Sequence, residues 1–222
     1  MKSLSTIPFE TFPALDALPR VRAVFLQRVP GLDVKTDRET ALQRLVGIQR
    51  EALDALGFAE MRLAKASQIH SANVKRISSF DIFPVPDCDA LVTTEPNLCL
   101  GVYVADCAAV FVADRHGRGI ALAHSGRKGT ELGIVPKTIA ALCEATGADA
   151  QDLIVQVSPC IRPPNYEVDF AADILSQAAE AGVREIHDCG TCTASNLQKY
   201  YSYRREHGQT GRLLAALALK EF

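Results

Sequence analysis

Short runs of apolar residues, separated by turn residues, occupy the centre of the chain. Leu98–Val104 is one such run, and residues 110–113 and 119–123 form two more. The sequence Asp-Arg-His-Gly at 114–117 separates the last two runs. Apolar runs of this length with turn residues at their ends are typical of buried strands rather than helices. The pattern therefore predicts consecutive strands, with polar residues gathered at the strand ends.

The N-terminal part of the chain has a different pattern. Residues 1–20 contain several prolines and are expected to form an irregular arm, followed by a strand at 22–26. The sequence from Thr36 to Glu39 matches a capping box, in which a Thr oxygen and a Glu satisfy free backbone N–H groups. Leucines at helical spacing follow, so a helix is predicted from here to Gly57.

The C-terminal half alternates between helical and strand patterns. Helices are predicted at 130–146 and 169–181, each followed by a glycine, and strands at 153–157 and 212–219. Alternation of strands with helices indicates the α/β class, and the length favours a single domain over residues 1–222.

Composition and charge narrow the class of protein. The 222 residues are 48% hydrophobic, which is enough for one substantial core. A net charge of −2 and scattered basic residues argue against a nucleic-acid partner. Neither a signal peptide nor a membrane span is recognisable, so we expect a cytoplasmic protein without membrane contact. The seven cysteines are then expected to be reduced thiols.

Two histidines and one cysteine stand at the ends of predicted strands. Cys107 follows the first central strand and His124 follows the third, and we expect these two strands to be neighbours in one sheet. With His70, the two side chains would form a ligand set suited to Zn²⁺, with a fourth position open to water or substrate. The spacing matches no zinc-finger pattern, so a purely structural role for each residue is an open alternative.

Five motifs then occur in a fixed order along the chain. They are QIH at 68–70, ADC at 105–107, AHSGRKG at 123–129, SPCI at 158–161, and SYRR at 202–205 with TGR at 210–212. This series resembles the YfiH-like family, also called laccase-domain or polyphenol oxidase proteins. The family motifs are QVHG, ADC, AHAGWRG, GPCI and SYRR followed by TGR. The resemblance covers the chain from about residue 60 to residue 222.

The resemblance implies a fold, a metal and an activity. The fold would be a single α/β domain of mixed sheet layers with flanking helices, related to a bacterial toxin deamidase domain. Zn²⁺ would be held by His70, Cys107 and His124, and these three with Asp106 would form the catalytic group. Family members have been assigned purine nucleoside phosphorylase and adenosine deaminase activities. The expected partners are therefore a purine nucleoside and phosphate, bound by a monomer or a homodimer.

Polar and basic side chains near the motifs are candidates for substrate binding. Arg204 and Arg205 belong to the SYRR motif, with Arg212 close behind, and guanidinium groups match phosphate oxygens in bidentate fashion. Lys128 lies in the third motif, in a basic loop that opens a predicted helix and would suit an anion. Gln68 opens the QIH motif and is the fourth candidate substrate contact besides Lys128, Arg204 and Arg205.

Two other features have more than one interpretation. Asp106 is either an acceptor that orients a ligand imidazole or a turn residue at a strand end. Cys189 and Cys192 form a Cys-x-x-Cys motif, which can indicate redox chemistry or half of a zinc site. No second such motif and no thioredoxin-like helix accompany it, so a structural placement is favoured.

Rival activities can be tested against the sequence. A multicopper laccase needs several His-x-His motifs, whereas this chain has five histidines and none of these motifs, so copper is expected less than zinc. A conventional nucleobase deaminase needs Glu and Cys where this chain has Ala72 and Pro163. A Cys–His hydrolase that edits cell-wall peptide precursors stays open, with Cys107 as nucleophile and His124 as base.

Departures from the family motifs leave one more alternative. Ser71 and Ser158 each replace a motif glycine, and Arg127 stands where the third motif has tryptophan. The three candidate metal ligands are intact while the residues around them have changed. A catalytically altered metal-binding module is therefore the alternative outside the enzymes.

Overall fold

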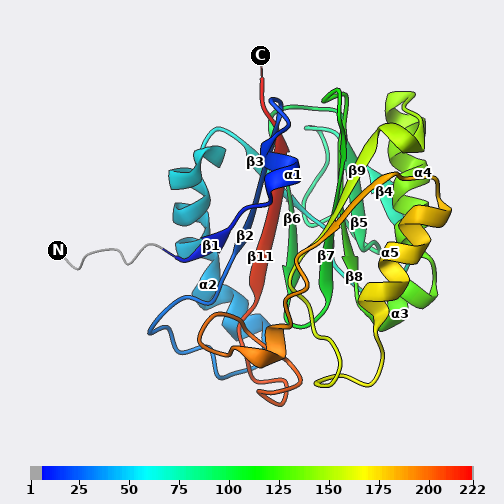
Figure 1. The fold of residues 1–222 in the computed structure, drawn as a ribbon. Coiled ribbons are helices and arrows are strands. Elements are labelled where there is room, and N and C mark those ends of the chain that lie inside the picture. Colours follow the sequence, from blue (N-terminus) through cyan, green and yellow to red (C-terminus); the bar gives the residue numbers. More distant parts are fainter. Residues whose placement is uncertain (1–6, 222) are drawn as a thin grey trace.

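The computed structural model describes residues 7–221 as two mixed β-sheets packed face to face (Figure 1). The strands of the five-stranded sheet are β1 (Phe9–Glu10), β2 (Val21–Leu26), β3 (Arg62–Lys65), β6 (Leu98–Val104) and β11 (Leu213–Leu219). The strands of the six-stranded sheet are β4 (Val74–Arg76), β5 (Ala90–Thr93), β7 (Ala108–Asp114), β8 (Ile120–Ser125), β9 (Leu153–Val157) and β10 (Glu185–Asp188). Their spatial orders are β1-β2-β11-β6-β3 and β10-β9-β7-β8-β5-β4.

Helices pack against both sheets. They are α1 (Pro13–Asp16), α2 (Arg38–Leu53), α3 (Arg127–Glu131), α4 (Ile134–Thr146) and α5 (Phe170–Glu180), with single helical turns at Asp54–Phe58, Ala150–Asp152 and Thr193–Ser195. In Figure 1, α2 lies outside the five-stranded sheet, and α4 and α5 lie outside the six-stranded sheet. The layers therefore follow the order helix, sheet, sheet, helices.

Strand β7 shows why the central apolar runs are continuous. Ala109, Phe111 and Ala113 face the core between the two sheets. Val110 and Val112 alternate with them and face the second core, beneath α4 and α5. Because both faces of the strand are buried, no polar residue interrupts the run. The expectation of a mixed α/β fold with flanking helices is confirmed, and β6 and β9 have the bounds that the sequence predicts.

The expected irregular arm is wrong for the part that the structure describes. Residues 1–6 lie outside the described range, but the following segment forms β1, which pairs with β2 through Phe9 and Leu26. The short helix α1 buries Leu15 completely, and Phe12 packs on Phe111 at 5.0 Å between ring centroids. Pro13 does not disrupt this segment, because proline is tolerated in the first helical turn.

The start of α2 also differs from the expectation. Asp37, rather than Thr36, is the N-cap residue, and its carboxylate accepts a hydrogen bond from the Thr40 N–H at 3.0 Å. The Thr36 hydroxyl donates to Asp37 instead of capping the helix. An aspartate at this position satisfies a free N–H group as well as threonine does.

The helix predicted at 130–146 is two helices. Gly133 takes a left-handed conformation with φ +75°, which ends α3 and allows α4 to start in a new direction. The remaining expectations for α4 hold, since Ile134, Val135 and Ile139 are buried and Gly147 ends the helix.

The two strands expected to deliver Cys107 and His124 do not share a sheet. Strand β6 belongs to the five-stranded sheet and β8 to the six-stranded one. Cys107 lies in the connection from β6 to β7, and it is β7 that pairs with β8, with Ala109 opposite His124. The short distance in sequence between the two strands does not reveal that the chain passes from one sheet to the other between them.

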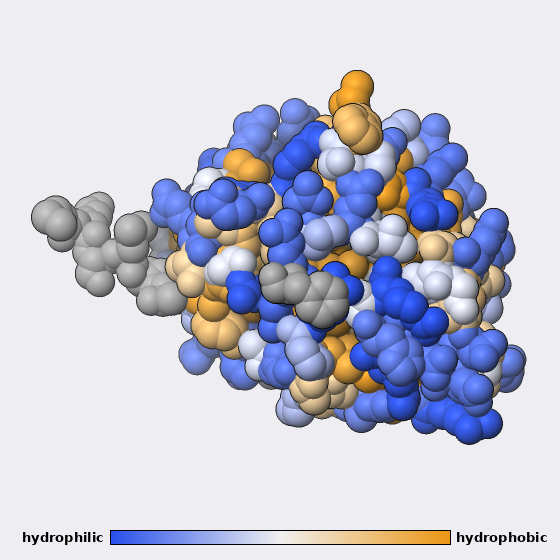
Figure 2. Space-filling model, turned by 90° about the horizontal axis from the view of Figure 1, so that it is seen from above, coloured by the Kyte–Doolittle hydropathy of each residue, from blue (hydrophilic) through white to orange (hydrophobic). Residues whose placement is uncertain are grey.

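The surface carries few large apolar groups. Figure 2 looks onto the end where β11 finishes, and hydrophilic residues dominate it, with hydrophobic residues in separate patches. Phe80 and Ile82 are the most exposed large hydrophobic residues, at 94% and 85%. Within residues 7–221 no helix has the length and apolar character needed to cross a membrane.

Candidate metal centre and cavity

Two connections between the sheets bring the candidate ligands together. Residues 66–73 lead from β3 to β4 and carry His70, whereas residues 105–107 lead from β6 to β7 and end at Cys107. His124 projects from β8 itself. The ligand atoms of His70, Cys107 and His124 all lie within 4.8 Å of one another. The three residues that the sequence proposed as a metal site therefore converge in space.

The two imidazoles have different surroundings. Their ring centroids are 4.8 Å apart in an edge-to-face arrangement. His124 is buried, while His70 is exposed at the cavity. The Nδ1–H of His124 donates to Asp89 Oδ1 at 2.9 Å, which leaves Nε2 of His124 as the available ligand atom. A carboxylate that orients a ligand imidazole in this way is common at metal centres.

Asp89 organises the centre from beneath. It is completely buried, and its carboxylate accepts hydrogen bonds from the backbone N–H groups of Ile69, His70 and Ser71 at 2.7–3.2 Å. Burial alone would raise its pKa, but hydrogen bonds from His124 and Ser71 outweigh burial and hold the pKa well below its ordinary value. One ionised carboxylate thus fixes both the His70 loop and the ring of His124.

The thiol of Cys107 is also set up as an anion. Burial acts to raise its pKa, but hydrogen bonds with His124 and His70 outweigh burial and lower the pKa to about 6. Burial likewise lowers the pKa of His124, and its hydrogen bonds with Asp89 and Cys107 reverse this and raise the pKa to about 9. The centre therefore favours a thiolate beside an imidazole whose second nitrogen is held by a carboxylate.

Gly126 explains one residue of the third motif. A Cβ atom at this position would lie 2.5 Å from Cys107 Sγ, closer than side-chain atoms approach one another. Any other residue would therefore push the thiol out of place. The φ angle of Gly126 is −98°, which all residues can adopt, so backbone conformation does not require a glycine here. The requirement comes from the close approach of the backbone to Cys107.

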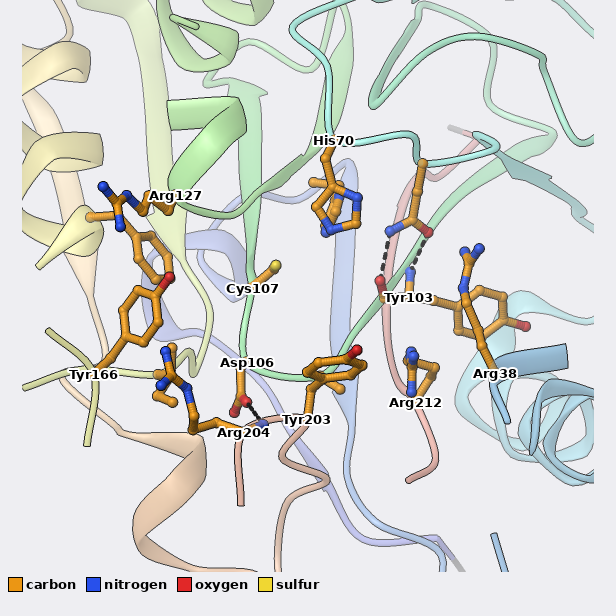
Figure 3. A pocket seen from close by; sticks show the side chains of 15 residues that line it. Arg38, His70, Tyr103, Asp106, Cys107, Arg127, Tyr166, Tyr203, Arg204 and Arg212 are labelled. Atoms are coloured by element: carbon orange, nitrogen blue, oxygen red, sulfur yellow. Dashed lines mark hydrogen bonds between the residues drawn. The ribbon is translucent and has the colours of Figure 1, made fainter. Parts of the chain in front are cut away.

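The three candidate ligands face a cavity of about 720 Å³, in the range of small-molecule sites. Figure 3 shows the cavity, with Cys107 between two groups of basic and aromatic side chains. The residues that line it are Arg38, Gln68, His70, Tyr103, Ala105, Asp106, Cys107, His124, Arg127, Ile161, Tyr166, Phe170, Tyr203, Arg204 and Arg212. A nucleoside-sized molecule fits such a volume, and the candidate ligands would contact it directly.

Among the predicted substrate contacts, Gln68 and Arg204 line the cavity, and so does Arg212, the third arginine considered for phosphate binding. The side-chain amide of Gln68 donates to the carbonyl of Tyr103 at 2.6 Å and accepts from its N–H at 2.9 Å. It therefore fastens the His70 loop to β6. Lys128 and Arg205 are exposed and do not line the cavity, so the structure does not bring these two together with the others.

Asp106 does not orient an imidazole in this structure. Its carboxylate accepts hydrogen bonds from the hydroxyls of Thr193 and Ser202, at 2.7 and 3.0 Å, and from the Arg204 N–H at 2.7 Å. The residue that orients His124 is Asp89. Asp106 instead ties two C-terminal segments, including the SYRR motif, to the connection that carries Cys107.

Backbone conformation also marks the site. Gln68, His70 and Asp106 have positive φ angles of 58°, 59° and 84°, and all three line the cavity. Residues other than glycine rarely adopt this conformation, and those that do gather at functional sites, where surrounding contacts hold them.

One wall of the cavity is built around Tyr166. The guanidinium of Arg204 lies over its ring, 4.8 Å from the centroid, and is paired with Glu167 at 3.0 Å. Arg127 lies on the same side of the cavity in Figure 3 and is paired with Glu131 at 2.8 Å. Arg127 replaces the tryptophan of the family motif, so a cation occupies the position expected for an aromatic wall.

The sequence did not single out Asp89, Arg38 or Tyr166. Asp89 directly precedes the buried strand β5, and a charged residue beside a fully apolar run is a signal that was available. Arg38 gave no signal, because the first turn of a helix is an ordinary place for an exposed arginine.

Cys189 and Cys192 are free cysteines, as are the other five.

The donor set fits a metal ion of the nitrogen- and sulfur-preferring kind. Two imidazoles and a thiolate within reach of one another suit a tetrahedral cation, and the cavity adjoins the fourth position. Within residues 7–221 this is the only group of three or more potential ligands close enough to hold an ion. The geometry thus supports one metal position and leaves the identity of the metal open.

The fold and this centre define a two-sheet α/β protein with one candidate metal site at a small-molecule cavity. The chain belongs to the family described as multi-copper polyphenol oxidoreductase laccase, whose model matches residues 30–176 and 168–220. A Corynebacterium glutamicum protein named purine nucleoside phosphorylase is 32% identical, over 86% of this chain and 92% of its own length. A Deinococcus radiodurans protein of the same name is 31% identical, over 74% and 73%.

Solved structures confirm the fold. The Bacillus licheniformis protein YfiH matches with a TM-score of 0.79 and 21% identity, covering 90% of this chain and 93% of its own. YlmD from Geobacillus stearothermophilus matches with a TM-score of 0.77 and 24% identity, covering 92% and 93%. The resemblance read from the five motifs is therefore confirmed, as a laccase-domain family with YfiH-like structure.

Proposed function

We propose that this protein is a zinc-dependent purine nucleoside phosphorylase. The observation that carries the proposal is the convergence of His70, Cys107 and His124 on a nucleoside-sized cavity. The names of the relatives that cover most of this chain support the substrate class. Zinc is favoured over copper because the donor set offers one site with one thiolate, and a multicopper oxidase needs several sites.

In this reaction phosphate replaces the purine at the anomeric carbon. The bond from C1′ to N9 breaks, a bond from C1′ to a phosphate oxygen forms, and the purine leaves with a proton. A zinc ion held by the three residues would supply a Lewis acid beside the substrate. Asp89 keeps His124 and the His70 loop in place, and Asp106 keeps the wall that carries Arg204 against the cavity.

Adenosine deamination is a second reaction that the same centre would support, because it needs water in place of phosphate as the attacking group. The two reactions give different products, so one experiment separates them. Purified protein is incubated with inosine and with adenosine, with and without phosphate, and products are resolved by chromatography. We expect free base and ribose 1-phosphate only with phosphate. Inosine and ammonia from adenosine without phosphate would indicate deamination.

A thiol hydrolase is a candidate from another class, and one observation favours it. Asp89, His124 and Cys107 stand in the order acid, imidazole, thiol that activates a cysteine nucleophile. Such an enzyme would cleave an amide, for example in a cell-wall peptide precursor, without metal. Exhaustive metal removal separates the proposals, because phosphorolysis should stop, whereas a thiol hydrolase should keep its activity and lose it on alkylation of Cys107.

A further inference from the structure

The cavity wall formed by Arg38 and Arg212 carries two positive charges, and the negative charges of Cys107 and Asp106 act on Arg212 without forming an ion pair with it. Neither guanidinium forms an ion pair with any residue in 7–221. Figure 3 places both beside Tyr103, on the opposite side of Cys107 from Tyr166. Arg212 is only 8% exposed. A nearly buried guanidinium without an ion-pair partner is unfavourable, so this wall favours an anionic ligand.

The hydrogen bonds of Arg212 show which of its atoms are free. Nη1 donates to the carbonyl oxygens of Thr210 and Gly211, both at 2.9 Å. Nε and Nη2 donate to no acceptor in residues 7–221, and neither is among the fully buried atoms without a partner. Because Arg212 is nearly buried and lines the cavity, these donors face the cavity. The Nε–Nη2 edge of a guanidinium offers two parallel N–H groups, which is the geometry that binds an oxyanion in bidentate fashion.

Arg38 strengthens this argument. It stands at the start of α2 and lines the same cavity. Burial lowers the pKa of Arg212, and the positive charge of Arg38 lowers it further, which outweighs the opposite effect of Cys107, Tyr203 and Asp106. The two guanidinium groups are therefore close enough to repel each other. Like charges that converge on a cavity are stabilised by an anion that lies between them.

The opposite wall of the cavity also carries two arginines and can be compared with this one. Arg127 and Arg204 also line the cavity, but each is already paired with a glutamate. Their charges are balanced within the protein, and they are exposed rather than buried. Among the arginines that line the cavity, Arg38 and Arg212 are therefore the two without an ion-pair partner in residues 7–221.

We propose that Arg38 and Arg212 form an oxyanion subsite that binds a phosphoryl group beside the metal centre. The phosphoryl group would be either free phosphate, the co-substrate of phosphorolysis, or a phosphate carried by the substrate. The identity of the anion rests on the proposed function, whereas the subsite itself rests on the free donors and on two guanidinium groups without an ion-pair partner. Arg212 would hold two oxygens of the anion, and Arg38 would close over it from the cavity mouth.

Calorimetric titration tests the subsite without relying on catalysis. Inorganic phosphate and, separately, ribose 5-phosphate are titrated into the parent protein and into the Arg212→Lys and Arg38→Gln variants. Lysine keeps the charge at position 212 but lacks the planar edge, so it tests the bidentate contact. Arg44→Gln is the matched control, because Arg44 lies on the same helix and does not line the cavity. Metal content and thermal unfolding are measured for each protein.

We expect both cavity variants to lose at least about tenfold in phosphate affinity, and the control to match the parent. If ribose 5-phosphate binds and free phosphate does not, the anion belongs to the substrate and the subsite stands. Equal phosphate binding by all four proteins, or binding of neither anion to folded parent protein, overturns the proposal. If Arg212→Lys does not fold, the exposed Arg38→Gln variant decides alone. Arginine-dependent phosphate binding without phosphorolysis would remove the proposed function and keep the subsite.

Discussion

Of the four connections that cross between the sheets, the two that carry His70 and Cys107 are both anchored by a buried aspartate, but in opposite senses. In the connection at 66–73, the anchor lies outside the loop, because Asp89 at the start of β5 accepts three of the loop's N–H groups. In the connection at 105–107, the anchor is part of the loop, because Asp106 reaches out to distant segments. The first aspartate holds candidate metal ligands, and the second holds a cavity wall.

This difference shows that ligand geometry and wall geometry have separate supports. Asp89 touches His124 and the backbone of His70, and it does not line the cavity. Asp106 lines the cavity and touches Arg204, but makes no hydrogen bond to either candidate ligand imidazole. Replacing one aspartate should therefore damage metal binding, and replacing the other should damage substrate binding.

The largest effect is expected for Asp89→Asn. An amide cannot supply the negative charge that His124 requires, and its NH₂ group would meet N–H donors of the loop. We expect metal affinity to fall by about 10–100-fold, as for lost partners of metal-bound histidines. The free energy of unfolding should fall by about 2–4 kcal/mol. Competition with a chelator and denaturant unfolding measure the two effects. Ser71→Ala, which removes one hydroxyl donor to Asp89, should do much less.

The second effect concerns Cys107 once metal is removed. Its pKa of about 6 lies below the ordinary thiol value, so the thiolate persists as pH falls and is protonated only near pH 6. At pH 7 we expect alkylation by iodoacetamide to be more than about tenfold faster than at Cys88, whose pKa burial raises to about 11. Peptide mapping by mass spectrometry follows both sites. Protection on adding zinc back would support ligation, and unchanged reactivity would count against it.

Asp106→Asn should give the third effect. The variant weakens the hydrogen bonds from Thr193, Ser202 and Arg204, so the wall that carries Arg204 should loosen. We expect KM for nucleoside to rise by about fivefold to tenfold, while metal content stays at the level of the parent. Steady-state kinetics and elemental analysis give the two numbers. Loss of metal in this variant would show that the two connections are not independent.

The smallest effect is expected for Arg205→Gln and Lys128→Gln. Both residues were candidates for substrate binding by sequence, but neither lines the cavity. We expect kcat/KM to change by less than about twofold, because exposed charges outside a site contribute little. A loss of tenfold or more in either variant would restore the sequence-based prediction and mean that the cavity extends further when substrate binds.

The parts of the fold that the sequence predicted are those in which both faces of an element are buried. Strands β6 and β9 show this, because every position is buried, nearly all are apolar (Gln156 in β9 is polar), and the run ends where the strand ends. The split between α3 and α4 was missed, since a single glycine inside an apolar helical pattern is compatible with a continuous helix. The N-terminal strand β1 was missed because two residues carry no periodicity.

The site was predictable as far as local motifs reach. His70, Cys107 and His124 were identified from their motifs, and the structure brings them together. Asp89 and Arg38 act through contacts that depend on tertiary structure, and a single sequence holds no information on which buried carboxylate will meet which imidazole. Arg212 illustrates both the predictable and the unpredictable part. Its TGR motif was noticed in the sequence, whereas the free Nε and Nη2 donors become apparent only in the tertiary structure.

The route of the chain between the sheets has a consequence for folding. His70 and Cys107 lie on two of the four segments that pass from one sheet to the other, and His124 belongs to the six-stranded sheet alone. A cation bound by all three would add a cross-link between the layers, beside their apolar contact and the hydrogen bonds of the connecting segments. Its binding free energy would then be part of the free energy of folding, and the two sheets would separate more readily whenever the cation leaves.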